Sequence, residues 1–257
     1  MKHSKIDFLD KLNHILAAFH LNIHQIVRYF PFFFIGVLIC LKGVSNDLYW
    51  YIMAGEDGPA EDWTCLVYLV ASLFALGIVI RLYKKHDWGT TAWGAVVCSI
   101  IFFVIAMEEI SWGQRIFDLQ SPEFFQTYNY QEEITIHNFL SRYYLHMLYI
   151  IIGIYGSFAW KFFPSQLKDK FPKIAQFIIP DRLLQWYFLP VALLYLYYDY
   201  LSVVLVDWLG WTMFQWYPGR YGWIIAKDQE PIELLLGIGI MCFMAILFNR
   251  QTHDQLL

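Results

Sequence analysis

Two adjacent carboxylates, Glu108 and Glu109, stand where an apolar segment of this sequence ends. The preceding stretch, Thr90 to Met107, carries no charge and is long enough to cross most of a lipid bilayer. An ionisable side chain in a membrane span costs about 2.5–3.5 kcal/mol on insertion scales and by default marks a functional site. Because neighbouring carboxylates do not easily share one partner, we expect at least one of them to hold a proton or a cation.

The composition is that of an integral membrane protein. The chain has 257 residues, of which 58% are hydrophobic and 20% aromatic, and its mean hydropathy is +0.43. Long apolar runs favour an all-α polytopic helix bundle over a barrel of alternating strands. The four cysteines show no C-x-x-C spacing, so we expect neither redox chemistry nor a thiolate metal site. No nucleic-acid partner is expected.

The apolar runs predict six transmembrane helices in a single bundle domain, residues 26–250. Before it lies a cytoplasmic or interfacial segment, residues 1–25. Apolar side chains at helical spacing in residues 5–19 predict an amphipathic helix there, on the membrane surface or against the bundle. After it comes a short cytoplasmic tail, 251–257, and no cleavable signal peptide is evident. The expected spans are 26–43, 63–80, 89–110, 139–160, 183–206 and 231–248.

The distribution of charge predicts the orientation of these spans. Of the 18 lysines and arginines, 13 fall in residues 1–28, in the connections 81–85 and 161–182, and at Arg250 after the last span. Basic residues favour the cytoplasmic side of a membrane, so both termini are predicted to be cytoplasmic. The other connections, which include a tryptophan-rich segment after span five, then lie outside.

This topology brings polar residues of several spans into one layer near the outer surface. Span three ends there, span five ends there, and spans four and six begin there. At helical spacing Glu108, Ser111 and Arg115 would share one face of span three. The sequence therefore predicts a carboxylate-rich cleft that opens outward. Its expected members are Glu108, Glu109, Arg115, His137, Asn138, Arg142, Asp207, Glu230 and Glu233, with Asp199 two turns deeper among tyrosines.

Each of these residues also has a structural interpretation. Glu230 and Glu233 lie in the first turns of a helix, where acids favour the positive dipole end. Arg142 could form an ion pair that clamps spans three and four. A single histidine in an apolar span, such as His146, is more typical of a hydrogen-bonded core residue than of a site, and Asp207 could cap a helix at the interface.

The pattern of residues 108–138 resembles that of a group of uncharacterised bacterial multi-pass membrane proteins. The matching residues are the run E-E-I-S-W-G-Q-R-I-F from Glu108, then Ser121-Pro122, N-Y-Q-E-E from Asn129, and His137-Asn138. The resemblance implies no activity, but it implies a bacterial protein, and hence the inner membrane. It also implies that Glu108, Glu109, Gln114, Arg115, Asn129, Gln131, Glu133, His137 and Asn138 belong to one site.

Three classes of function fit these patterns. The first is a membrane-embedded enzyme acting on a lipid or lipid-linked substrate at the outer leaflet, either through a divalent cation (Mg²⁺, Mn²⁺ or Zn²⁺) or through Glu109 and His137 as general acid and base. The second is a cation- or proton-coupled transporter or channel, against which the inner halves of the spans offer almost no charge. The third is a non-catalytic subunit that binds a membrane protein partner or a second copy of itself.

The residue assignments favour the first class. We assign catalysis to Glu108, Glu109 and His137. The same three, with Glu233, are the expected metal ligands. Binding and orientation are assigned to Gln114, Arg115, Asn129, Gln131, Glu133, Asn138, Arg142 and Asp199.

Overall fold

The structure is a computed structural model, and it describes residues 23–55, 58–114, 116–129, 133–136, 139–215, 217 and 222–253. Its described part is all-α, as predicted, with one isolated bridge between Tyr217 and Ile225. The expected amphipathic helix falls almost wholly in residues 1–22, outside the described residues. The last residues of the tail, 254–257, also lie outside them.

Six helical segments within the described residues are long and apolar enough to cross a membrane. They confirm the prediction of six spans. Four of them begin and end within about five residues of the expected positions, whereas the second segment, Asn46–Lys84, and the fifth, Pro172–Trp208, begin well before the expected spans 63–80 and 183–206. The helices are α2 (Ile23–Val44), α3 (Asn46–Tyr49), η1 (Trp50–Ala54), α4 (Pro59–Lys84), α5 (Thr90–Glu109), η2 (Ser111–Gly113), α6 (Glu123–Tyr128), α7 (Arg142–Phe162), α8 (Ser165–Lys170), α9 (Pro172–Ile178), η4 (Arg182–Leu184), α10 (Gln185–Leu196), η5 (Tyr197–Leu201), η6 (Val204–Trp208), η7 (Thr212–Phe214), η8 (Ala226–Asp228) and α11 (Gln229–His253).

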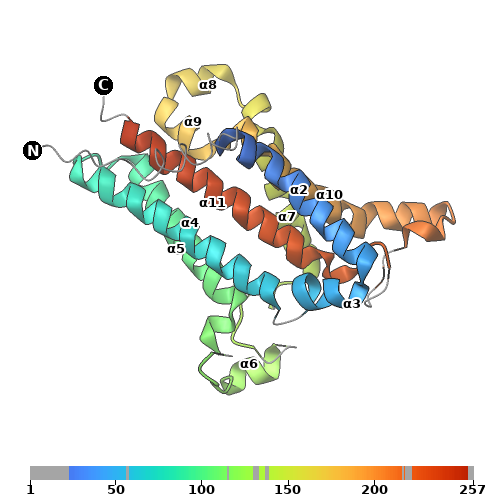
Figure 1. Ribbon diagram of the computed structural model, residues 1–257. Helices are drawn as coiled ribbons and strands as arrows, with labels where there is room; N and C mark the ends of the chain where they lie inside the picture. The colour runs from blue at the N-terminus through green and yellow to red at the C-terminus, as the bar shows by residue number, and fades with distance from the viewer. Residues whose placement is uncertain are drawn as a thin grey trace, which may run out of the picture.

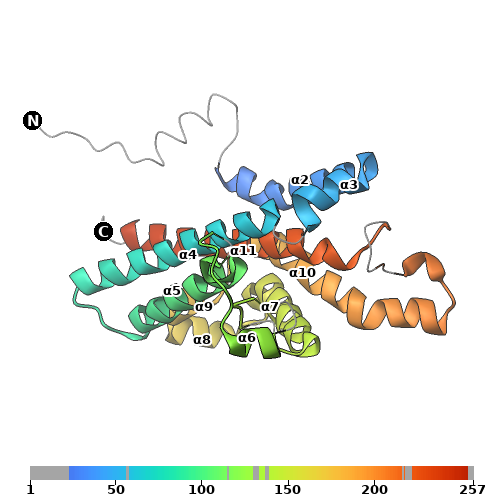
Figure 2. The same cartoon turned by 90° about the horizontal axis from the view of Figure 1, so that it is seen from below.

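Helix α11 lies in the middle of the bundle and packs against α4, α10 and α2 (Figure 1). Helix α5 pairs with α4, and α7 pairs with α10. Turned by 90°, the structure shows α2 and α3 on one face of the α4–α11 layer, with α5 and α7 on the other (Figure 2). Residues from α4, α5, α7, α10 and α11 can therefore meet inside the bundle.

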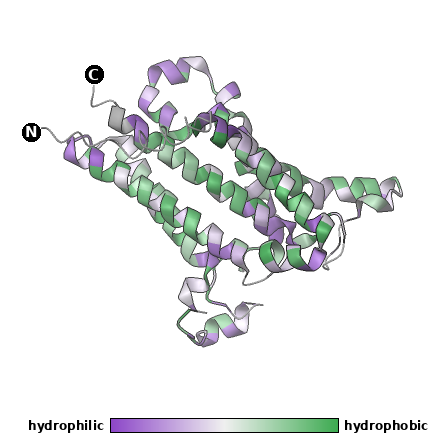
Figure 3. Cartoon of the chain, viewed as in Figure 1, coloured by the Kyte–Doolittle hydropathy of each residue, from purple (hydrophilic) through white to green (hydrophobic). Residues whose placement is uncertain are grey.

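The two ends of the bundle carry different appendages. Helices α8 and α9 form a hairpin with many hydrophilic residues near the C-terminal end of α11. Helix α6 lies at the opposite end of the bundle, beyond the end of α5 (Figures 1 and 3). The long helices between them are coloured mostly hydrophobic, and hydrophilic colour returns at the first turns of α11 (Figure 3). Beyond η5, the segment through η6 and η7 extends past the packed helices and exposes Trp208, Trp211 and Met213.

The end of α5 differs from the sequence prediction. Helical spacing placed Glu108, Ser111 and Arg115 on one continuous face, but the α-helix ends at Glu109. The next turn is a 3₁₀ segment in which Ser111, Trp112 and Gly113 have φ angles of 47°, 54° and 78°. Left-handed backbone costs roughly 1–2 kcal/mol for each residue that has a Cβ, so the turn must be held by other contacts.

Candidate functional site

The side chain of Glu108 stabilises the 3₁₀ turn that follows α5. One of its carboxylate oxygens accepts the indole N–H of Trp112 at 2.7 Å, and the other accepts the backbone N–H of Ile136 at 2.6 Å. The side chain is buried. Glu108 thus ties the end of α5 to the loop that precedes α7, and both of its oxygens already bond to the chain. Its catalytic assignment stays a prediction.

The motif residues after α5 that the structure describes build the same loop. The side-chain oxygen of Gln114 accepts the backbone N–H of Ile134 at 2.9 Å. The amide of Asn129 donates to the Glu133 carbonyl at 2.6 Å and to the Thr135 hydroxyl at 3.1 Å, and Asn129 and Thr135 are buried. Through these contacts Gln114, Asn129 and Glu133 belong to the same hydrogen-bonded loop as Glu108. The contacts stabilise this loop, which connects α5 to α7.

Several predicted site residues lie elsewhere. Arg142 is exposed at the first position of α7, and Asp207 is exposed on η6, on the segment that extends past the bundle. Outside the described residues are Arg115, Gln131, His137 and Asn138, whose assignments stay predictions.

A second group of polar side chains lies inside the bundle, four or more residues from the starts of α7 and α11. Glu233 of α11 accepts hydrogen bonds from the hydroxyls of Tyr195 of α10 and Tyr149 of α7. The two tyrosine rings are parallel, with centroids 4.7 Å apart. Glu109 interacts electrostatically with Glu233 and Glu230. The structure thus brings Glu109 and Glu233 into one polar layer, whereas Glu108 turns toward the loop.

The same layer contains a pair that the sequence interpretation did not join. His146 of α7 lies with Nδ1 at 2.8 Å and 3.0 Å from the two carboxylate oxygens of Asp199 on η5. The His146 ring also packs on Tyr195, with centroids 4.7 Å apart. The sequence favours a core role for His146 and places Asp199 among tyrosines, without joining the two. The sequence feature that could have paired them is their position, because both residues lie well inside their predicted spans rather than at the ends.

Local helix geometry helps to position Asp199. It lies in a π-helical segment, η5, and a second such segment, η6, follows. π-Helical turns are rare and occur frequently at functional sites. The neighbouring Tyr198 is buried and donates to the carbonyl of Ile225 at 2.7 Å, which fixes this turn against the residue that precedes η8.

We call the set Asp199, His146, Tyr195, Glu233 and Tyr149 the acid–base layer. His146 and Glu233 each lie four residues inside their helices, or about 6 Å at the rise of an α-helix. Toward the other end, α5 from Thr90 to Met107 and α11 from Leu234 to Phe248 carry no charged residue. The buried charge in these spans is confined to one end of the bundle.

The described residues do not assemble a metal site. Among them, no three His, Cys, Asp or Glu side chains are placed to hold a metal ion together. The predicted ligand set also includes His137, which lies outside the described residues, and Glu108, whose oxygens bond to Trp112 and Ile136. A divalent cation therefore stays a prediction.

One ion pair at this end of the bundle was missed altogether. Lys42, near the end of α2, lies 2.8 Å from both carboxylate oxygens of Asp228. Asp228 also accepts the Tyr49 hydroxyl at 2.6 Å and the Ile225 backbone N–H at 2.9 Å. Both oxygens of Asp228 accept hydrogen bonds, and the ion pair joins α2 to η8, directly before α11. The only sequence signal was a lysine at the end of an apolar run.

Together, the fold and the layer define an α-helical integral membrane protein with a buried acid–base group near one end. No protein-family model, curated protein or solved structure matches the chain. Its function must therefore be inferred from the site itself.

Proposed function

We propose that this protein is a membrane-embedded enzyme that performs acid–base chemistry on a lipid or lipid-linked substrate within one leaflet. The observation that carries the proposal is the His146–Asp199 pair beside Tyr195 and Glu233. A histidine whose one ring nitrogen bonds a carboxylate is oriented, and its other nitrogen can then take or give a proton.

The layer offers distinct partners for the two proton transfers. His146 acts as general base, with Asp199 holding its Nδ1–H and stabilising the imidazolium that forms. The Tyr195 hydroxyl can give a proton to the leaving oxygen or nitrogen, and the imidazolium of His146, whose ring packs on Tyr195, then resupplies that proton. Glu233 accepts the Tyr195 hydroxyl and so positions it. The reaction class supported is hydrolysis or transfer at a phosphate, ester or amide bond, with water or a substrate hydroxyl as the nucleophile.

The position of Asp199 supports a substrate that arrives from the bilayer. Its side chain is 23% exposed, although it is paired with the buried His146. The next residues, Tyr200 and Leu201, are exposed on the outside of the bundle. The layer therefore lies close to the lipid-facing surface between α7 and η5. On the predicted topology this is the outer leaflet.

The one-sided distribution of charge favours this function over conduction. A proton or cation pathway needs polar groups through the full thickness of the bundle. Helix α4 has no charged residue between Trp63 and Ile80, and α5 and α11 have none over comparable lengths. A subunit that only binds a partner has no need of a histidine–aspartate pair inside the bundle.

The test is lipid conversion by the purified protein in vesicles made from bacterial inner-membrane lipids, followed by lipid mass spectrometry. Wild type should convert at least one lipid, and His146→Ala should lower the rate at least about 100-fold, the usual contribution of a general base. Glu233→Gln should lower it as well. The matched controls, His24→Ala and Glu123→Gln, replace exposed residues of α2 and α6 and should keep the rate. A wild type that leaves every lipid unchanged, or a fully active His146→Ala, contradicts the proposal.

A further inference from the structure

An open crevice of about 330 Å³ lies at the end of the bundle opposite the acid–base layer. It is bounded by the end of α7, the α8–α9 hairpin, η4 and the last turns of α11. We call it the basic crevice. Its volume is at the lower end of the range for small-ligand sites. The side chains used below are Trp160, Lys168, Gln176, Asp181, Arg182 and Arg250.

Two of its three cations are held in place by neutral groups. The ammonium of Lys168 donates to the backbone carbonyl of Trp160 at 2.9 Å, and the guanidinium of Arg182 lies over the Trp160 ring at 4.9 Å from its centroid. Within the described residues neither has a carboxylate at ion-pair distance. Only Arg250 does, at 3.1 Å from Asp181. The crevice therefore keeps a net positive charge on positioned side chains.

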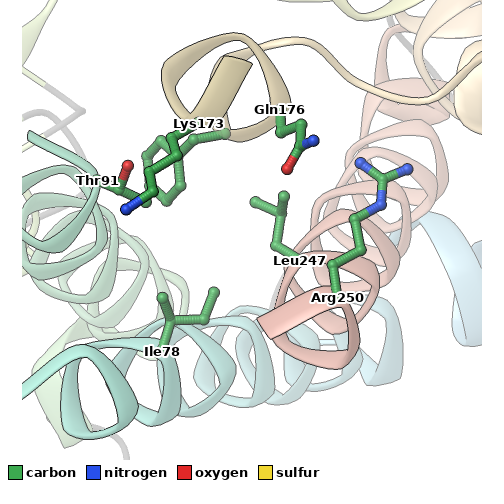
Figure 4. Close-up of a pocket in the computed structure, with 7 residues that line it drawn as sticks. Ile78, Thr91, Lys173, Gln176, Leu247 and Arg250 are labelled. Atoms are coloured by element: carbon green, nitrogen blue, oxygen red, sulfur yellow. The ribbon is translucent and has the colours of Figure 1, made fainter. Parts of the chain in front are cut away.

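A second hollow on the other side of α9 is too small to compete as a ligand site. Its volume is about 10 Å³, which is no more than one water molecule needs. Figure 4 shows Lys173, Gln176, Leu247 and Arg250 around it, with Ile78 below. Gln176 and Arg250 line both hollows. A ligand with a headgroup therefore belongs in the basic crevice.

The surroundings of the crevice are those of a membrane interface. Trp160 lies near the end of a predicted span, where tryptophan is enriched at the level of lipid headgroups. Phe162, two residues further on, is 71% exposed, and Ile178, next to the lining residue Ile179, is exposed too. An acyl chain attached to a group in the crevice could run along this apolar surface into the bilayer.

We propose that the basic crevice binds the phosphate headgroup of an anionic phospholipid. Lysine and arginine are the side chains that recognise phosphate oxygens, and arginine does so through two parallel N–H groups. Basic crevices between helix ends bind anionic headgroups on the cytoplasmic side of membranes. A lipid fits better than free phosphate because the cations stand beside exposed apolar side chains at the end of the spans. This site is independent of the acid–base layer.

The experiment is competitive binding in nanodiscs that contain phosphatidylglycerol and phosphatidylcholine, with the lipids retained by the full-length protein counted by native mass spectrometry. Wild type should retain phosphatidylglycerol in preference. Lys168→Gln combined with Arg182→Gln should lower the preference at least about tenfold. Gln176→Glu should lower it in the same direction, because it adds a negative charge to the wall without removing an anchoring contact.

The control is Lys84→Gln combined with Lys170→Gln, which removes two exposed charges at the same end of the bundle but none from the crevice. It should keep the wild-type preference. Equal losses in the control and the crevice variants would overturn the proposal, since they would show a general surface-charge effect. Displacement of the lipid by inorganic phosphate would overturn it too, because the site would then recognise a free anion.

Discussion

Adjacent residues can serve different purposes in a helix, and Glu108 and Glu109 show how. Successive positions of an α-helix point about 100° apart. Glu108 bonds Trp112 and Ile136 in the loop, while Glu109 interacts electrostatically with Glu233 and Glu230 of α11. The contacts of Glu108 are those of a structural anchor for a turn with left-handed backbone at Ser111 and Trp112.

Removing this anchor should destabilise the protein. Glu108→Ala would leave the Trp112 indole N–H and the Ile136 backbone N–H without an acceptor, each costing about 1–3 kcal/mol if it stays buried. We therefore expect a loss of up to roughly 2–6 kcal/mol in the free energy of unfolding, measured by denaturant unfolding in detergent micelles. Glu108→Gln, which keeps one acceptor oxygen, should lose less. Glu123→Ala, at an exposed position of α6, should change stability by less than about 0.5 kcal/mol. A Glu108→Ala protein as stable as wild type would show that the anchor is not needed.

The site could be predicted from the sequence only where charge interrupts an apolar run. That signal singled out Glu108, Glu109, Asp199 and Glu233 as candidates, of which Asp199 and Glu233 lie in the acid–base layer. It could not pair Asp199 with His146, because the two are joined only through the packing of α7 on α10. Nor could it separate anchors from the acid–base layer, since helical spacing continued across Ser111 to Arg115 where the helix in fact ends at Glu109.

At the scale of elements, the close approach of α7 and α10 positions the acid–base layer. His146 and Tyr149 are on α7, whereas Tyr195 is on α10 and Asp199 follows on η5. Gly153 and Gly156 of α7 face Phe188 and Ala192 of α10. Small residues at such an interface let two helix backbones come close inside a membrane. The spans themselves were predictable from their apolar runs, but the π-helical turns were not, because tertiary contacts decide where a helix widens.

A methyl group at Gly153 should disturb this interface. A Cβ there would lie 2.6 Å from the Ala192 backbone nitrogen and 2.9 Å from the Phe188 carbonyl oxygen. Because backbone atoms cannot rotate away, Gly153→Ala should cost about 1–3 kcal/mol of unfolding free energy. The matched control is Gly36→Ala on α2, where a Cβ would meet nothing within 4 Å and should be neutral or stabilise by up to about 1 kcal/mol. Thermal unfolding in detergent measures both. If the two variants shift the midpoint equally, packing between α7 and α10 does not limit stability.

For the whole molecule, the two ends of the bundle are chemically different. One end carries the acid–base layer, the loop built on Glu108 and an aromatic segment that exposes Trp208 and Trp211. The other carries the α8–α9 hairpin and the basic crevice. If the basic end faces the cytoplasm, the proposed chemistry takes place in the outer leaflet and the proposed phospholipid is bound in the inner one. Both assignments to a leaflet therefore rest on the orientation of the chain.

The orientation is tested by labelling single cysteines with a membrane-impermeant maleimide, in a background where Cys40, Cys65, Cys98 and Cys242 are replaced by alanine. Thr127→Cys is exposed on α6 and Gln166→Cys is exposed on α8, at opposite ends of the bundle. Because basic residues favour the cytoplasmic side, we expect the first to react in intact cells and the second only after permeabilisation. The reverse pattern would invert the topology. It would move the acid–base layer to the inner leaflet and the basic crevice to the outer surface. The contacts within both sites would be unchanged, but the crevice would lose the support that comes from binding of anionic headgroups on the cytoplasmic side.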